Sequence, residues 1–302
     1  MSRAIFIVGA TGKQGGATVK ALLAHPAFDT PKYSIFAMTR DPSSASAKRL
    51  ESSSPAIQLV KGDMNDAAGA FKALTSKPWG VFIVTNPQKK PKTEDEVGIS
   101  FVDEALKAGA KHIVFSGVER GSANGGFNKT NVPHFMTKHD IEAHLMEATK
   151  SSETTYTILR PVFFLDNLEW GFVGKVISTT WRDYVNKKLQ VVDSADIGKV
   201  AANAFMDPES PDYKNKAISL AGDELSFEEA NKIFKEKVGS DIPVTYGIFA
   251  MLATWLSHDI GTMFKFFNDP GYSADIKYVN KLAHVSNFGT WVEKSSFMKK
   301  TT

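Results

Sequence analysis

The pattern of apolar and polar positions alternates between two types along the first half of the chain. Short continuous apolar runs, rich in β-branched and aromatic residues, alternate with segments of helical length. Continuous apolar runs predict strands that are buried on both faces of a parallel sheet. We expect strands at residues 4–8, 34–38, 57–60, 81–84, 113–115 and 156–159, and helices at 15–24, 66–74, 94–108 and 133–148. The pattern predicts an α/β fold with a doubly wound parallel sheet, the Rossmann fold.

The second half of the chain is less regular. Residues 163–180 and 242–267 are rich in aromatic residues, leucine and methionine. Ser226 and Glu229 form a capping box that predicts a helix start, and Gly239 predicts its end. We find no linker dense in proline, glycine or serine. We therefore expect a Rossmann core over residues 1–160 and a smaller C-terminal α/β lobe over residues 161–302, interleaved with that core.

Composition and charge narrow the class of protein. Hydrophobic residues make up 42% of the 302 positions and charged residues 23%, which is ordinary for a globular protein. The formal charge of +3 and the absence of a basic helix argue against direct nucleic-acid binding. The chain has no cysteine, which excludes disulfides, cysteine-bound metals and thiol catalysis. The first apolar run is too short for a secretion signal, and no apolar stretch is long enough to span a membrane. We expect a cytoplasmic protein without a membrane partner, or a nuclear one if it is regulatory.

A glycine-rich turn directly follows the first expected strand and opens the first expected helix. The glycines have the spacing G-x-x-G-x-x-G. Such a turn lets the backbone approach a pyrophosphate, and the helix N-terminus offers free N–H groups and a partial positive charge. A turn without a ligand is the alternative, but the strand before it and the helix after it favour a dinucleotide. The expected contacts are Gly9, Thr11, Gly12, Lys13, Gln14 and Gly15.

The end of the second expected strand indicates which dinucleotide is bound. Arg40 takes the position where an acidic residue would bind the ribose hydroxyls of NAD(H). A guanidinium group can pair with the 2′-phosphate of NADP(H), and Lys13 would add charge nearby. Asp41 could serve the ribose if the register slipped by one residue. We therefore predict NADP(H), with NAD(H) as the alternative.

Two further strand ends should contact the cofactor, because ligands bind outside the carboxyl ends of parallel strands. Asp63 and Met64 follow the third strand, and the Asp63 carboxylate could reach the adenine amino group. Asp63 could instead cap the helix that follows. Thr85 and Asn86 follow the fourth strand and should line the ribose or nicotinamide half.

Several motifs occur in one order along nearly the whole chain. They are residues 9–16, 39–40, 62–63, 115–118, 159–161, 163–167, 196–198 and 288–291. This ordered set resembles the NmrA-like family of atypical short-chain dehydrogenases. The resemblance implies a Rossmann core with a smaller C-terminal region for a substrate or partner. It also implies either a redox-linked regulator that binds dinucleotide or an NADPH-dependent reductase related to the isoflavone reductase type.

The resemblance also indicates candidate catalytic residues. In ordinary short-chain dehydrogenases, a tyrosine four residues before a lysine donates a proton to the substrate carbonyl. Here Lys138 is present, but His134 stands at the tyrosine position. Histidine side chains titrate near neutral pH, so His134 could be the proton donor. The resemblance to the isoflavone reductase type also allows Lys138 to act alone, as a proton relay or as a ribose ligand. Alternatively, Lys138 only binds the ribose and His134 is a polar residue at a helix start. Ser116, at the end of the fifth strand, could orient the carbonyl.

An apolar pocket is expected after the sixth strand. Phe163, Phe164, Asn167 and Trp255 would line it and suit an aromatic or medium-sized ligand, unless they are core residues. Two functions remain open. Lys138 and the aromatic second half favour an NADPH-dependent reductase acting on a small apolar or aromatic substrate. The missing tyrosine favours a non-catalytic redox sensor that binds NAD(P) and acts through a regulatory protein partner.

Overall fold

The computed structural model describes residues 3–29, 32–88, 90–121, 129–169 and 171–298. Contacts between residues divide the chain into two compact units. Unit 1 comprises Met1–Gly117, Thr137–Arg160 and Ile197–Ile218, and unit 2 comprises Val118–Met136, Pro161–Asp196 and Ser219–Thr302.

No helix in the described ranges has the length and apolar character needed to cross a bilayer.

Unit 1 is built on a seven-stranded sheet with the order β3-β2-β1-β4-β5-β6-β9. Strand β1 pairs in parallel with both β2 and β4, so the strand order reverses at β1. This arrangement confirms the doubly wound fold. The strands are β1 (Arg3–Ile7), β2 (Tyr33–Thr39), β3 (Ile57–Lys61), β4 (Gly80–Val84), β5 (His112–Ser116), β6 (Thr155–Pro161) and β9 (Lys216–Leu220).

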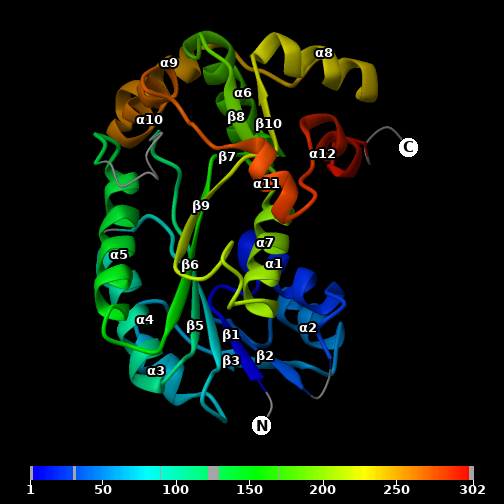
Figure 1. Cartoon of the computed structure of the whole chain (residues 1–302). Coiled ribbons are helices and arrows are strands. Elements are labelled where there is room, and N and C mark those ends of the chain that lie inside the picture. Colours follow the sequence, from blue (N-terminus) through cyan, green and yellow to red (C-terminus); the bar gives the residue numbers. More distant parts are fainter. Residues whose placement is uncertain (1–2, 30–31, 89, 122–128, 170, 299–302) are drawn as a thin grey trace. The chain divides into compact units, whose positions relative to one another are not determined.

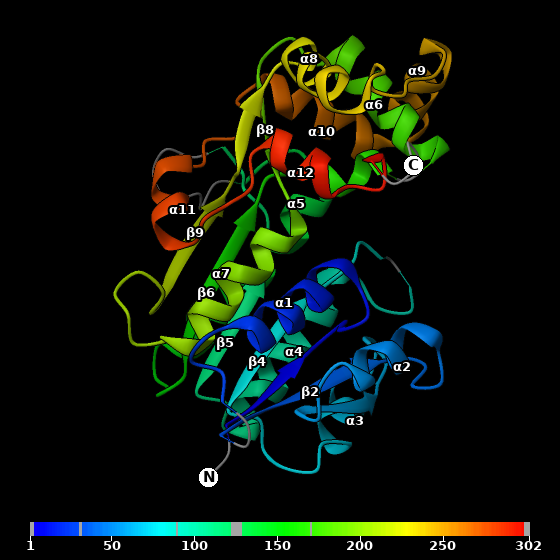
Figure 2. The ribbon, with the colours of Figure 1, turned by 90° about the vertical axis from the view of Figure 1, so that its right-hand side faces the viewer.

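Helices cover both faces of this sheet (Figures 1 and 2). One face carries α1 (Lys13–Ala24), α2 (Ala45–Ser52) and α7 (Ser194–Met206). The other carries α3 (Ala67–Lys72), α4 (Glu94–Ala108) and α5 (Pro133–Thr149). Central strands are therefore buried on both sides: every residue of β5 is buried. This burial is the physical reason for the continuous apolar runs in the sequence.

Local signals set the ends of helix α4, whose bounds are those expected from the sequence. The Glu96 carboxylate accepts a hydrogen bond of 2.8 Å from the Thr93 N–H, the reciprocal half of a capping box. Gly109 ends the helix with φ of 80°, in the left-handed region that favours glycine. The first turn of this helix lies beside the end of β4, because Glu94 accepts a hydrogen bond of 2.8 Å from the Thr85 hydroxyl.

Unit 2 contains a three-stranded sheet with the order β10-β8-β7, in which β8 pairs in parallel with β7 and antiparallel with β10. Its strands are β7 (Phe163–Phe164), β8 (Leu189–Val192) and β10 (Asp223–Leu225). The helices are η1 (Leu165–Glu169), α6 (Phe172–Tyr184), α8 (Phe227–Val238), α9 (Gly247–Leu256), α10 (His258–Asn268), α11 (Ile276–Leu282) and α12 (Phe288–Lys294). The capping box expected at Ser226 and Glu229 starts α8, and Gly239 ends it with φ of 83°.

Candidate functional site

The glycine turn between β1 and α1 leaves no room for side chains. Gly9 has φ of 67°, which favours glycine. A Cβ atom added at Gly12 would lie 3.2 Å from the Gly9 carbonyl oxygen, and one added at Gly15 only 2.3 Å from it. Helix α1 has no side-chain cap and no acidic residue in its first turn. Its first N–H groups can therefore face an anion.

We predict that a methyl group at Gly15 displaces this turn. In Gly15→Ala, the added carbon cannot avoid the Gly9 carbonyl, so dinucleotide affinity should fall by about 10–100-fold, as expected for a strain of 1–3 kcal/mol. Fluorescence titration with NADPH measures the effect. Gly109→Ala is the control, because Gly109 also has a positive φ but lies at the far end of α4. Equal affinity losses in the two variants would contradict a specific role for the turn.

The two candidate ribose-reading residues after β2 have different surroundings. Arg40 is exposed immediately after the strand. The Asp41 carboxylate instead accepts hydrogen bonds from the Ser43 hydroxyl at 2.5 Å and the Ser43 N–H at 2.9 Å. These bonds, the hydroxyl bond first, hold the pKa of Asp41 below its ordinary value. The Asp41 carboxylate is thus engaged in the turn before α2, whereas Arg40 is exposed.

Asp63 and Met64 lie in the turn after β3. The Asp63 carboxylate accepts hydrogen bonds from the Asn65 N–H at 2.8 Å and from the Asn65 side chain at 3.0 Å. The N–H bond is the main cause of a lowered Asp63 pKa, and the charge of Arg40 acts in the same direction. Asp66, rather than Asp63, caps α3. Met64 is half-buried against the core of unit 1.

A buried ammonium group lies at the carboxyl ends of β4 and β5. Lys138 of α5 is 8% exposed. Its Nζ donates to Thr85 Oγ1 at 2.7 Å, to the Thr85 carbonyl at 2.9 Å and to the Ser116 carbonyl at 3.4 Å. It also forms an ion pair of 2.9 Å with Glu94 Oε1. The topology therefore brings Lys138, Thr85 and Ser116 together at the carboxyl ends of β4 and β5.

Glu94 is the member of this cluster that sequence reasoning missed. It is 1% exposed and accepts hydrogen bonds from the hydroxyls of Thr85 at 2.8 Å and Thr137 at 2.7 Å. Burial alone would raise the pKa of Glu94, but the Lys138 charge and these hydrogen bonds outweigh burial and lower the pKa. Glu94 is therefore the counter-ion that permits a buried charge at Lys138.

Ser116 also connects the end of β5 to the glycine turn. Its hydroxyl donates a hydrogen bond of 2.5 Å to Gln14 Oε1, and the residue is fully buried. Asn86, after β4, is exposed. The expected cofactor contacts at the ends of β1, β4 and β5 thus lie along one edge of the sheet.

His134 and the acidic residue Asp259 are in contact within unit 2. Its Nδ1 lies 2.7 Å from Asp259 Oδ1, and its backbone N–H donates to the same oxygen at 3.2 Å. Asp259 belongs to the first turn of α10 and was also missed from sequence. A carboxylate bonded to one ring nitrogen fixes the orientation of an imidazole. The described residues contain no group of three or more possible metal ligands.

The residues expected to line a substrate pocket differ in exposure within unit 2. Phe163 is 4% exposed and packs against the rings of Trp181 and Phe267. Phe164 and Asn167 are half-buried. Trp255, on α9, is 77% exposed. Phe163 therefore belongs to the core of unit 2, whereas the other three present part of their surface.

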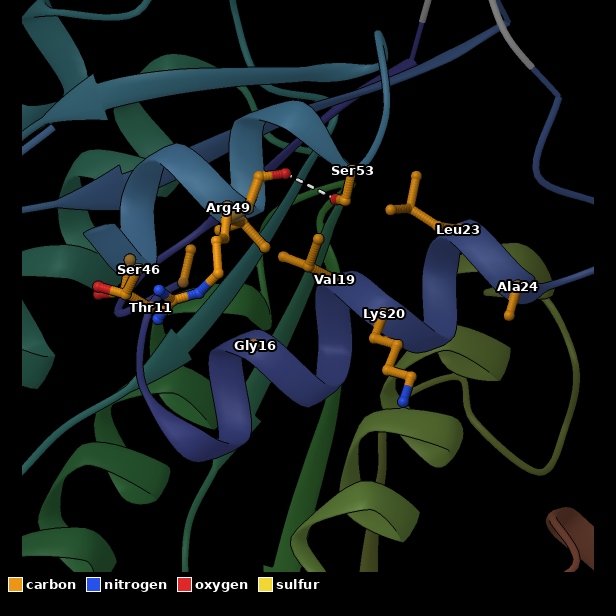
Figure 3. Close-up of a pocket in the computed structure, with 11 residues that line it drawn as sticks. Thr11, Gly16, Val19, Lys20, Leu23, Ala24, Ser46, Arg49 and Ser53 are labelled. Carbon is orange, nitrogen blue, oxygen red and sulfur yellow. Dashed lines mark hydrogen bonds between the residues drawn. The ribbon is translucent and has the colours of Figure 1, made fainter. Parts of the chain in front are cut away.

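A cleft of about 600 Å³ runs between α1 and α2 in unit 1 (Figure 3). One end meets the glycine turn at Ala10, Thr11 and Gly16. Its other lining residues are Val19, Lys20, Leu23 and Ala24 from α1, and Ser46, Arg49, Leu50 and Ser53 from α2 and the residue after it. The cleft thus extends the candidate nucleotide site along the helical face of the sheet.

Residues 1–295 match the NmrA-like family. The chain belongs to this family. An NmrA-like family domain-containing oxidoreductase of Aspergillus hancockii is 31% identical, with 85% of this chain and 78% of the relative covered. The resemblance inferred from the ordered motifs is confirmed.

Solved structures share the fold at low identity. The triphenylmethane reductase of Citrobacter sp., complexed with NADP(H), has a TM-score of 0.71 and 19% identity, with 97% of this chain and 99% of that chain covered. NmrA, a negative transcriptional regulator in complex with NAD, has a TM-score of 0.71 and 15% identity, with 99% and 96% covered. The same fold thus occurs in a reductase and in a regulator.

Proposed function

We propose that this protein is an NADP(H)-dependent oxidoreductase that reduces a small apolar or aromatic substrate. The observation that carries the proposal is the Lys138 ammonium group, held by Glu94, Thr85 and Ser116 at the edge of the sheet where ligands of this fold bind. The oxidoreductase name of the Aspergillus relative and the NADP(H) complex of the Citrobacter reductase support the same chemistry.

The glycine turn fits a dinucleotide, because Cβ atoms at Gly12 and Gly15 would press on the Gly9 carbonyl and displace the turn, and the N-terminus of α1 carries no competing acid. Arg40 would bind the 2′-phosphate, with NAD(H) as the alternative ligand if Arg40 does not discriminate. The proposed contacts are Gly9, Thr11, Gly12, Lys13, Gln14, Gly15, Arg40, Asp63, Met64, Thr85, Asn86 and Lys138.

The protein's own contribution would be position and a proton. Bound NADPH supplies a hydride when a substrate accepts it. Lys138 would hold a ribose hydroxyl, and Ser116 would orient the substrate oxygen. His134 would donate the proton that this oxygen takes up, while Asp259 holds the imidazole ring in place. Phe164, Asn167 and Trp255 would offer apolar and amide surface to the substrate.

We predict that Arg40 sets cofactor preference. The unchanged protein should bind NADPH more tightly than NADH, because a charged hydrogen bond to the 2′-phosphate contributes about 1.5–3 kcal/mol, or about 10–100-fold in affinity. Arg40→Ala should weaken that preference and leave NADH affinity unchanged. Titration of both cofactors against both proteins measures this. Equal affinities in the unchanged protein would refute the preference.

A redox sensor acting through a protein partner is the second candidate. The observation that favours it is that the tyrosine position of a short-chain dehydrogenase holds His134, whose ring is already bound to Asp259. NADPH oxidation across a panel of carbonyl, enone, quinone and dye substrates tests the two candidates. Turnover supports the oxidoreductase. No turnover, together with partner binding that differs between NADP⁺ and NADPH, supports the sensor.

A further inference from the structure

A second arginine reaches toward the glycine turn from helix α2. Arg49 is exposed and lines the cleft between α1 and α2. Its side chain extends along the cleft toward Ser46 and Thr11 (Figure 3). These two residues bring hydroxyl groups to the end of the cleft that meets the glycine turn. A guanidinium group with two hydroxyls is a combination that binds phosphate oxygens.

Within the described residues, no acidic side chain forms an ion pair with the Arg49 guanidinium group. The acidic residue of α2, Glu51, pairs instead with Lys48 at 3.1 Å. The acidic residue in the turn before the helix, Asp41, accepts hydrogen bonds from Ser43 instead. Arg49 is therefore available to an incoming anion.

We propose that Arg49 is a second contact for the 2′-phosphate of NADP(H), reaching it from α2 while Arg40 reaches it from the end of β2. The phosphomonoester would lie at the end of the cleft, between the hydroxyls of Thr11 and Ser46. This assignment rests on the proposed function, because it requires the dinucleotide to bind at the glycine turn. It adds a specificity determinant from helix α2, nine residues after Arg40.

Lys20 provides a matched control. It is a cation that lines the same cleft, but its side chain points away from Arg49 (Figure 3). If the cleft acts only through its general positive charge, Lys20→Ala and Arg49→Ala should have similar effects. If Arg49 contacts the phosphate, only Arg49→Ala should weaken binding, and Arg49→Lys should be intermediate because lysine lacks the planar fork of donors.

The experiment is a fluorescence titration of NADPH and NADH against the unchanged protein, Arg49→Ala, Arg49→Lys, Lys20→Ala and Arg40→Ala. Arg49→Ala should weaken NADPH binding by about 10–100-fold and NADH binding by less than about twofold, as for loss of one charged hydrogen bond. Adenosine 2′-monophosphate should displace NADPH from the unchanged protein, and poorly from Arg49→Ala. Inorganic phosphate at the same concentration should displace little, which separates the nucleotide phosphate from a free anion.

Each other outcome has a distinct meaning. If Arg40→Ala removes the NADPH preference and Arg49→Ala retains it, the assignment of Arg49 is wrong and the proposed cofactor stands. Equal losses for NADPH and NADH in Arg49→Ala would also overturn it. If the unchanged protein binds NADPH and NADH equally, the cofactor preference itself fails. An unchanged melting temperature in Arg49→Ala confirms that this exposed substitution leaves the fold intact.

Discussion

Replacing His134 by alanine should lower turnover with NADPH by about 10²–10⁴-fold, the range expected for loss of a positioned proton donor. The affinity for NADPH should stay within about twofold, because a proton donor acts on the substrate and not on the cofactor. Steady-state rates and a parallel fluorescence titration measure the two effects separately. Asp259→Asn should lower turnover by a smaller factor, because the imidazole keeps a hydrogen-bond partner but loses the negative charge.

His144→Ala is the control for this prediction. His144 lies on the same helix and also bonds an aspartate, Asp103, at 2.6 Å, but it is partly exposed away from β4 and β5. Lys138→Met should instead lower both turnover and NADPH affinity, since Lys138 would bind the ribose. Rates in His134→Ala that match those of His144→Ala would remove His134 from the chemistry.

Replacing Glu94 by leucine should destabilise the protein by about 3–5 kcal/mol, because it leaves the Lys138 ammonium group buried without its counter-ion. Chemical denaturation followed by circular dichroism measures the change. Glu104→Leu is the control: Glu104 is on the same helix and pairs with Lys107 at 3.2 Å at the surface, where an ion pair contributes at most about 1 kcal/mol.

The double variant Glu94→Leu/Lys138→Met separates charge burial from packing. Replacing both partners of a buried pair by apolar residues is often neutral, so the double variant should recover most of the lost stability. If the double variant is as unstable as Glu94→Leu, lost packing explains the effect and the ion pair does not.

The same pair predicts how stability depends on pH. The pKa of Glu94 is lowered in the folded protein, so its contribution is present above the unfolded pKa of about 4.3 and is lost as pH falls through the folded value. The unfolding free energy of the unchanged protein should therefore fall toward low pH relative to that of the double variant, which lacks the Glu94 carboxylate.

Sequence reasoning succeeded where the signals are local. The first strand, the glycine turn and the first helix are specified by neighbouring residues, and the capping residues Thr93 and Gly109 fix both ends of α4. The six expected strands all lie in the sheet, and the central ones, such as β5, are apolar because they are buried on both faces. By contrast, β10 has the sequence Asp-Glu-Leu and carries no apolar pattern that could predict it.

The partners inside the candidate site could not be predicted in the same way. Glu94, Asp95 and Glu96 form one acidic first turn, and each suits the positive end of a helix equally well. Only the packing of α4 decides that Glu94 is buried against Lys138 while Glu96 stays exposed. Asp259 meets His134 from a position 125 residues later, a separation at which no sequence spacing is informative.

The four acceptors around Lys138 outnumber the three hydrogens of its ammonium group. At any moment one of the four acceptors therefore lacks a full hydrogen bond from Lys138 Nζ. The longest contact, to the Ser116 carbonyl at 3.4 Å, is the weakest of the four. An arriving hydroxyl oxygen could take the hydrogen that points to Ser116 and leave every donor satisfied. A ligand oxygen would thus replace the weakest acceptor of the cluster and leave intact the bonds from Lys138 to Glu94 and Thr85.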